Sequence, residues 1–148
     1  MPLTAFESPQ LEQFIRRFED LFYANDPASM TSYYTQDAQL MADGIQPIQG
    51  HKAIRQFWDA AIARATAVRA RRTIQLHEAH CSGDLGYALC TVKIQIPPAG
   101  GTPGISGTSR ASWDATIWQR DHDGNWRIAV DISTPLPPPI PPKPPPHH

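Results

Sequence analysis

Two kinds of hydrophobic spacing divide the chain into a helical first half and a strand-rich second half. In the first half, apolar residues recur every three or four positions, as they do along one face of a helix. A first helix carries Leu11, Phe14, Ile15, Phe18, Leu21 and Phe22, and a third carries Ile54, Phe57, Trp58, Ala61, Ile62 and Ala65. Ser8 is the predicted N-cap of the first helix. Asp26 is predicted to cap a short second helix with Met30, Tyr33 and Tyr34, and a brief strand is expected at 38–42 before a loop at 43–50.

The second half alternates apolar and polar residues, which predicts strands at 73–80, 85–96, 109–120 and 125–134. The segment 97–107 is rich in proline and glycine and is expected to be a loop. Three helices, one early strand between the second and third of them, and four long antiparallel strands predict an α+β fold with the helices on one antiparallel sheet.

The last predicted hairpin allows its register to be worked out. If residues 121–124 form a four-residue loop, Asp114 lies opposite Asp131 and Thr116 opposite Ala129. The other face would then hold only apolar residues, namely Ala111, Trp113, Ala115, Ile117, Trp126, Ile128, Val130 and Ile132. This register therefore predicts one polar face and one apolar face.

Two facing aspartates favour acid–base chemistry if the helices cover them. Like charges at this spacing repel, so one carboxyl should hold its proton while the other stays ionised. One base beside one acid suits hydration, dehydration, isomerisation or cyclisation of an uncharged organic substrate. The alternative is a pair of solvated aspartates whose repulsion is reduced by Arg110 or Arg127.

Other side chains are candidates for binding a substrate. Tyr34, Trp58 and Tyr87 can line a cavity or form ordinary core. Asp43 follows the early strand and can reach a pocket mouth or simply form a turn. The basic run from Arg64 to Arg72 is interpreted as a solvated helix end leading into a strand.

Composition and charge exclude several classes of function. The net charge is −1, so no basic field attracts nucleic acid or anionic lipid. We expect a cytoplasmic protein, because the N-terminus has no secretory signal and no apolar run is long enough for a membrane span. Cys81 and Cys90 are expected to be buried thiols, since they would not lie opposite each other. No metal, phosphate-loop or nucleophile-elbow motif is present, so neither a metal nor a cofactor is expected.

Proline is concentrated at the C-terminus. Nine of the 16 prolines lie between Pro135 and His148, which predicts a globular domain at 1–134 and a polyproline II tail at 135–148. The tail is interpreted as a spacer or as a segment packed on its own sheet or a neighbouring subunit. Docking into an aromatic groove of a partner is the alternative.

The order of elements and two segments resemble the nuclear transport factor 2-like superfamily, and most closely its SnoaL-like branch. The segments are IQGHKAIRQFW at 48–58 and the final hairpin, IWQR followed by DGNWRI, between 117 and 128. The resemblance covers about residues 9–134. It implies a strongly bent sheet wrapped around the helices as a cone, an internal apolar pocket and a homodimer formed through the outer sheet face.

Two enzyme groups of that superfamily refine the expectation. The ketosteroid isomerases have a tyrosine where this chain has Phe18 and a general-base aspartate near Ala42, one place from Asp43, which disfavours steroid isomerisation. Their oxyanion-hole acid lies on the strand of Asp114. Limonene-type epoxide hydrolases place two aspartates and an arginine on the last two long strands, but Arg110 precedes Asp114 by about 13 Å along the strand, too far for a direct clamp.

These observations lead to one hypothesis and its alternatives. The first is a homodimeric, cofactor-free pocket protein that performs acid–base catalysis on a small apolar organic molecule, with Asp131 as base and Asp114 as its protonated partner. Arg110, Thr116, Tyr87, Trp58, Tyr34 and Asp43 are the expected substrate-binding residues. The second is a non-catalytic ligand-binding or assembly module of the same fold, and the third is a docking protein that acts through its proline tail.

Overall fold

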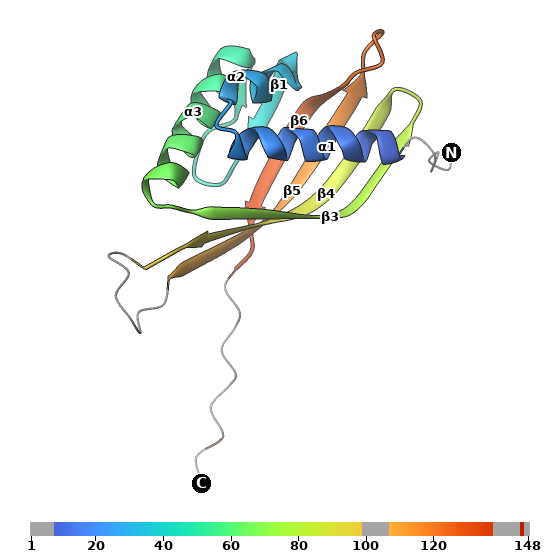
Figure 1. Cartoon of the computed structure of the whole chain (residues 1–148). Coiled ribbons are helices and arrows are strands. Elements are labelled where there is room, and N and C mark those ends of the chain that lie inside the picture. Colours follow the sequence, from blue (N-terminus) through green and yellow to red (C-terminus); the bar gives the residue numbers. More distant parts are fainter. Residues whose placement is uncertain (1–7, 99–106, 138–145, 147–148) are drawn as a thin grey trace.

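The computed structural model describes residues 8–98, 107–137 and 146, and these form three helices and one six-stranded sheet (Figure 1). The elements are α1 (Ser8–Tyr23), α2 (Pro27–Ser32), β1 (Tyr34–Met41), β2 (Ile48–Gln49), α3 (His51–Ala67), β3 (Arg71–Ser82), β4 (Leu85–Ile96), β5 (Thr108–Arg120) and β6 (Trp126–Pro135). The predicted α+β class is confirmed, and the long helices and strands lie where the hydrophobic spacing placed them.

The sheet has the strand order β2-β1-β6-β5-β4-β3, and only the pairing of β1 with β6 is parallel. It is strongly bent, with α1 crossing its concave face and α2 and α3 lying beside α1 (Figure 1). Gly86 on β4 allows α1 to approach closely, since a Cβ there would lie 3.1 Å from Leu11 Cδ2. The helices therefore cover one face of the sheet and leave the other open.

The start of β1 differs from the prediction. Asp26 caps α2 as expected, accepting a hydrogen bond from Ser29 N at 3.1 Å. The helix ends at Ser32, however, and the strand begins at Tyr34 rather than at residue 38. Pairing with β6 explains the difference, because Ile128 N donates to Tyr33 O at 2.7 Å and Tyr34 lies beside Ile128 in the parallel ladder. Pairing with β6 thus places Tyr34 in a strand, although the sequence pattern had placed it in the second helix.

The predicted register of the last hairpin is wrong. Arg120 pairs with Trp126, so the loop has five residues (121–125) instead of four, and Ala129 is an unpaired bulge residue opposite the step from Ile117 to Trp118. Beyond the bulge, Asp114 pairs with Ser133 and Asp131 with Thr116. The loop and the bulge each shift β6 by one residue, so the total shift is two, and the two aspartates still share one face.

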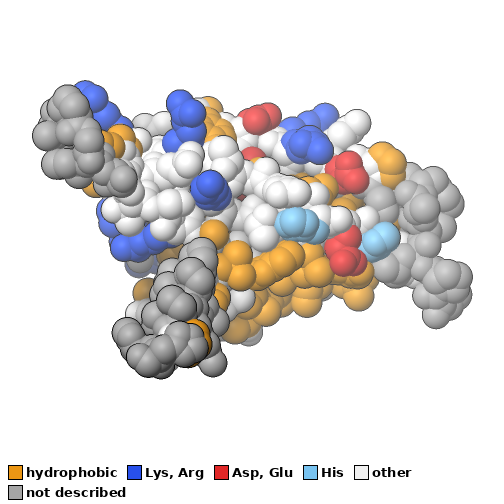
Figure 2. Space-filling model, turned by 90° about the horizontal axis from the view of Figure 1, so that it is seen from below, with side chains coloured by type: hydrophobic (Ala, Val, Ile, Leu, Met, Phe, Trp, Pro, Cys, Tyr) orange, Lys and Arg blue, Asp and Glu red, His pale blue; other side chains and the backbone are white. Residues whose placement is uncertain are grey.

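The same shift corrects the predicted apolar face. Trp126 and Ile128 lie between the loop and the bulge, where the shift is one residue, and both are fully buried in the core. Trp113, Ile117 and Ile132 lie on the outer face and are 38–40% exposed. In a view from the side of β3, hydrophobic side chains form a continuous area along one edge of the molecule, bordered by histidine and acidic side chains (Figure 2).

The remaining predictions concern the cysteines, the membrane and the tail. Cys81 and Cys90 are buried thiols that face Gly86 and Leu76 respectively across the β3–β4 ladder. Within the described part of the chain, no helix combines the length and the apolarity that crossing a membrane requires. Most of the predicted loop at 97–107, and the tail beyond residue 137 apart from Pro146, lie outside the described residues.

Candidate functional site

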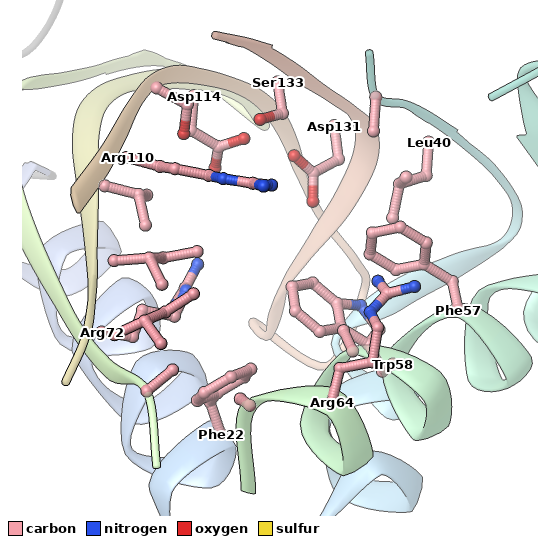
Figure 3. A pocket seen from close by; sticks show the side chains of 18 of the residues that line it. Phe22, Leu40, Phe57, Trp58, Arg64, Arg72, Arg110, Asp114, Asp131 and Ser133 are labelled. Carbon is pink, nitrogen blue, oxygen red and sulfur yellow. The ribbon is translucent and has the colours of Figure 1, made fainter. Parts of the chain in front are cut away.

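A pocket of about 500 Å³ lies between the concave face of the sheet and helices α1 and α3. Its walls are mostly apolar and include the aromatic side chains Phe18, Phe22, Phe57 and Trp58. The polar lining residues are Arg64, Arg72, Arg110, Ser112, Asp114, Asp131 and Ser133. Figure 3 shows Asp114, Ser133 and Asp131 together on the sheet wall and Trp58 and Phe22 on the helix side. A largely apolar cavity with a few convergent polar groups is typical of a site for a small organic ligand.

The two aspartates form a hydrogen-bonded carboxyl pair in this pocket. Burial and the neighbouring Asp131 raise the pKa of Asp114 well above its ordinary value. Burial also raises the pKa of Asp131, which is only 5% exposed, but hydrogen bonds from Asp114 and Tyr34 favour its ionised form. Asp114 is therefore the group that keeps a proton, which it donates to Asp131.

Two aromatic side chains hold Asp131 in place from behind. The Tyr34 hydroxyl donates to Asp131 Oδ2 at 2.7 Å, and Trp58 Nε1 donates to the Tyr34 hydroxyl oxygen at 3.1 Å. Burial and the Asp131 carboxylate raise the pKa of Tyr34 well above its ordinary value, so Tyr34 remains a donor. The hydrogen bonds thus link α3, β1, β6 and β5: Trp58 donates to Tyr34, and Tyr34 and Asp114 both donate to the Asp131 carboxylate.

A second pair of charges lies beside the carboxyls. Arg72 on β3 forms a buried ion pair with Glu19 on α1, and its guanidinium lies 4.9 Å from the Phe22 ring centroid. Its charge lowers the pKa of both aspartates, against the larger effect of burial. Arg72 contradicts the interpretation of residues 64–72 as a solvated helix end, because its side chain points inward, where Glu19 compensates its charge.

The structure brings together most of the predicted site residues. Asp114, Asp131, Arg110 and Trp58 line the pocket, and Tyr34 lies directly behind Asp131. Thr116 is buried next to them, paired with Asp131 across the ladder, and accepts a hydrogen bond from Trp118 Nε1.

Two predicted residues lie elsewhere. Tyr87 pairs with Ile117 on the outer face and donates to Glu78 Oε2 at 2.5 Å, since odd-numbered positions of β4 point away from the helices. Asp43 is exposed in the segment after β1 and does not line the pocket, although its neighbour Ala42 does.

Sequence reasoning missed several lining residues. Arg64 lies three positions after Ala61, on the apolar stripe of α3. Phe22 and Phe57 belong to the predicted apolar stripes of the first and third helices, but they were not named as pocket residues. Arg72, Ile74 and Leu76 are spaced two residues apart on β3, so they lie on the same face of the strand. This spacing was the available signal that Arg72 points inward. No group of three or more His, Cys, Asp or Glu side chains in the described ranges is arranged to hold a metal ion.

Comparisons with known proteins identify a family and a fold for this chain. The family described as SnoaL-like domain matches residues 15–127. The comparison with curated proteins found no match.

Three solved structures illustrate the likeness of fold. An NTF2-like protein with a cystatin-like fold from Novosphingobium aromaticivorans has a TM-score of 0.75 and 19% identity, covering 88% of this chain and 83% of that one. A ketosteroid isomerase-like protein from Erwinia carotovora atroseptica has a TM-score of 0.72 and 16% identity, covering 91% and 100%. A structure from Xanthomonas campestris that is named as a calcium/calmodulin-dependent protein kinase II association domain has a TM-score of 0.64 and 12% identity, covering 86% of each chain. At these identities the likeness shows the fold alone.

Proposed function

The chain belongs to the SnoaL-like domain family of the NTF2-like fold, and we propose that its pocket performs cofactor-independent acid–base catalysis on a small, largely apolar organic molecule. The observation that carries the proposal is the buried pair Asp114–Asp131 at the wall of an apolar cavity. Burial and the neighbouring carboxyl raise the pKa of Asp114, whereas hydrogen bonds from Asp114 and Tyr34 favour the ionised form of Asp131. The family is compatible with small-molecule binding or catalysis, and the carboxyl pair favours catalysis.

Each carboxyl has a distinct role in the proposed reaction. Asp131 removes a proton from a carbon or oxygen atom of the ligand, and Asp114 gives its proton to the oxygen on which negative charge develops. After one turnover Asp131 holds the proton and Asp114 is ionised. The proton returns through the hydrogen bond between them, so the pair is restored without another reactant. This cycle fits dehydration, hydration, isomerisation or cyclisation equally well.

The surrounding residues support these roles. Tyr34 donates to Asp131 and favours its ionised form, and Trp58 keeps the Tyr34 hydroxyl oriented. The aromatic walls exclude water, which strengthens charge interactions at the reacting atoms. Phe18 and Ala42 line the pocket. The resemblance implies that ketosteroid isomerases have a tyrosine at the position of Phe18 and an aspartate near Ala42, which argues against steroid isomerisation.

The second candidate is a non-catalytic binding or assembly module. One structure with the same fold is named as a kinase association domain, and the exposed apolar residues Trp113, Ile117 and Ile132 on the outer sheet face offer a surface for assembly. We propose that a second copy of this chain covers that face, as in the superfamily the sequence resembles. A dimer of this kind is compatible with either function.

Proton exchange distinguishes the two candidates without knowledge of the natural substrate. Small cyclic ketones are incubated with the protein in D2O, and deuterium entering next to the carbonyl is measured by mass spectrometry. We expect the wild-type protein to accelerate exchange of the ketones it binds and Asp131→Asn to abolish exchange while binding persists. Asp43→Asn is the matched control, because Asp43 is exposed outside the pocket. Ketones that bind without exchange would support the non-catalytic module.

A further inference from the structure

Two arginines of the pocket have no acidic partner among the described residues. Arg64 on α3 and Arg110 on β5 both line the pocket and are exposed, so the pocket reaches the surface at these residues. Arg72, in contrast, pairs with Glu19. The sequence of residues 99–106 contains no aspartate or glutamate that could pair with either arginine.

The backbone positions of both arginines are displaced from those of the carboxyl pair and Trp58 toward the same end of the pocket. Arg110 lies four residues before Asp114, which is about 13 Å along a strand. Arg64 lies six residues after Trp58, about 9 Å along the helix. Figure 3 shows the two side chains extending into the pocket, one from the helix wall and one from the sheet wall. They can therefore contact the same end of one ligand.

The charges lining the pocket leave an excess of positive charge at this end. The carboxyl pair shares one proton and holds a single negative charge, which the Tyr34 hydrogen bond stabilises. The charge of Arg72 is matched by Glu19. The charges of Arg64 and Arg110 remain, next to the apolar residues Ala65, Val68 and Ile96. A wholly apolar ligand would make no use of either guanidinium group, which would then contact water alone.

We propose that the ligand carries one anionic group, such as a carboxylate, which Arg64 and Arg110 bind together at the entrance of the pocket. Guanidinium groups suit this task because their planar donors match a carboxylate or sulfonate in two-point contacts. The apolar body of the ligand then lies against Trp58 and Phe57, with its far end at Asp114 and Asp131. This inference rests on the proposed function and narrows its substrate class from apolar molecules to apolar acids.

Two fluorescent dyes with the same apolar body test the proposal by binding alone. N-phenyl-1-naphthylamine is neutral, and 8-anilino-1-naphthalenesulfonate is the same molecule with one sulfonate. We expect the wild-type protein to bind the sulfonate at least about tenfold more tightly than the neutral dye. In Arg64→Gln/Arg110→Gln this preference should disappear, while the affinity for the neutral dye stays the same. A naphthoate should displace the bound sulfonate, and its methyl ester should displace it less well.

Two further variants make the result specific to the pocket. Arg16→Gln/Lys52→Gln removes two exposed positive charges that do not line the pocket, and it should keep the full preference. Ala61→Phe fills the cavity beside Trp58 and should weaken the binding of both dyes.

The possible failures are distinguishable. Equal affinity of the wild-type protein for the two dyes, or a preference that survives Arg64→Gln/Arg110→Gln, would overturn the anionic subsite and leave the apolar pocket intact. Failure of both dyes to bind, or binding that survives Ala61→Phe, would contradict the pocket function itself.

Discussion

Asp114 and Asp131 hydrogen-bond to each other although neither is the other's cross-strand partner. Asp114 pairs with Ser133 and Asp131 with Thr116, so the two carboxyls meet diagonally across β5 and β6. Diagonal neighbours on one sheet face are farther apart than direct partners, but their side chains still reach each other. The pair therefore shares a proton at the wall of the pocket while Ser112 and Ser133 flank it.

The raised pKa of Asp114 predicts an unusual dependence of stability on pH. The unfolded chain releases the Asp114 proton near pH 4, whereas the folded chain keeps it to a higher pH. The folded state thus binds more protons above pH 4, and the free energy of unfolding should fall as the pH rises through the raised pKa. Each pKa unit of the shift corresponds to about 1.4 kcal/mol.

Asp114→Asn should remove this loss of stability, because its amide donates to Asp131 at every pH. Urea unfolding at several pH values from 4 to 8 measures the effect. We expect the variant to gain stability relative to the wild type as the pH rises, while Asp43→Asn follows the wild-type curve. Parallel curves for Asp114→Asn and the wild type would show that Asp114 is ionised in the folded chain.

Tyr34→Phe should raise the pKa of Asp131, because the variant removes a hydrogen bond that favours the carboxylate. The carbon resonance of the Asp131 carboxyl, followed by NMR during a pH titration, reports this pKa directly. Trp58→Phe removes the bond to the Tyr34 hydroxyl but leaves Tyr34 in contact with Asp131, so its shift should be smaller. A Tyr34→Phe titration identical to that of the wild type would mean that Tyr34 does not stabilise the charge.

Periodicity predicted the helices and strands well, because each of them buries one regular stripe of side chains. The register of the last hairpin depends instead on two single residues, one extra in the loop and one in the bulge at Ala129. Either extra residue alone would have turned Asp131 to the other face of the sheet. Because the two shifts add to two residues, Asp131 stays on the same face as Asp114. Alternation along a strand cannot reveal a bulge when, as here, both faces are apolar near it.

The candidate site was predicted best for residues that alternate regularly along the two strands of the last hairpin. Asp114 and Asp131 met this condition, but Tyr87 was assigned to the pocket on its residue type, and β4 turns it outward. The inward position of Arg72 was not predicted, because its partner Glu19 is 53 residues away in the sequence (72 − 19) and lies on another element, α1. A pairing between distant elements leaves no local signal in one sequence.

Replacing one residue of the Arg72–Glu19 pair should destabilise the folded chain, whereas replacing both residues should have little effect on its stability. Both side chains are buried, so Arg72→Met leaves a buried carboxylate without its partner and should lower the free energy of unfolding by about 3–5 kcal/mol. Glu19→Leu/Arg72→Met should recover most of this loss, because neither charge remains. Urea unfolding of the two single variants and the double variant gives the coupling energy.

An exposed ion pair on α3 provides the control for this prediction. Arg55 and Asp59 are both about half exposed, so Arg55→Met should change the free energy of unfolding by no more than about 0.5 kcal/mol. A loss for Arg72→Met that is as small as this would mean that water reaches the Arg72–Glu19 pair.

We expect the chain to form a homodimer through the outer face of the sheet. Trp113, Ile117 and Ile132 lie together on β5 and β6, each more than a third exposed, and apolar patches of this kind on a folded chain mark contact surfaces. Light scattering after size exclusion should give about twice the chain mass of 16.4 kDa. Ile117→Glu should convert the dimer to a monomer, because a second copy would bury the new charge. Ile45→Glu introduces the same charge at an exposed apolar residue before β2, and it should leave the dimer intact. A monomeric wild-type protein or a dimeric Ile117→Glu variant would contradict a dimer formed through this face.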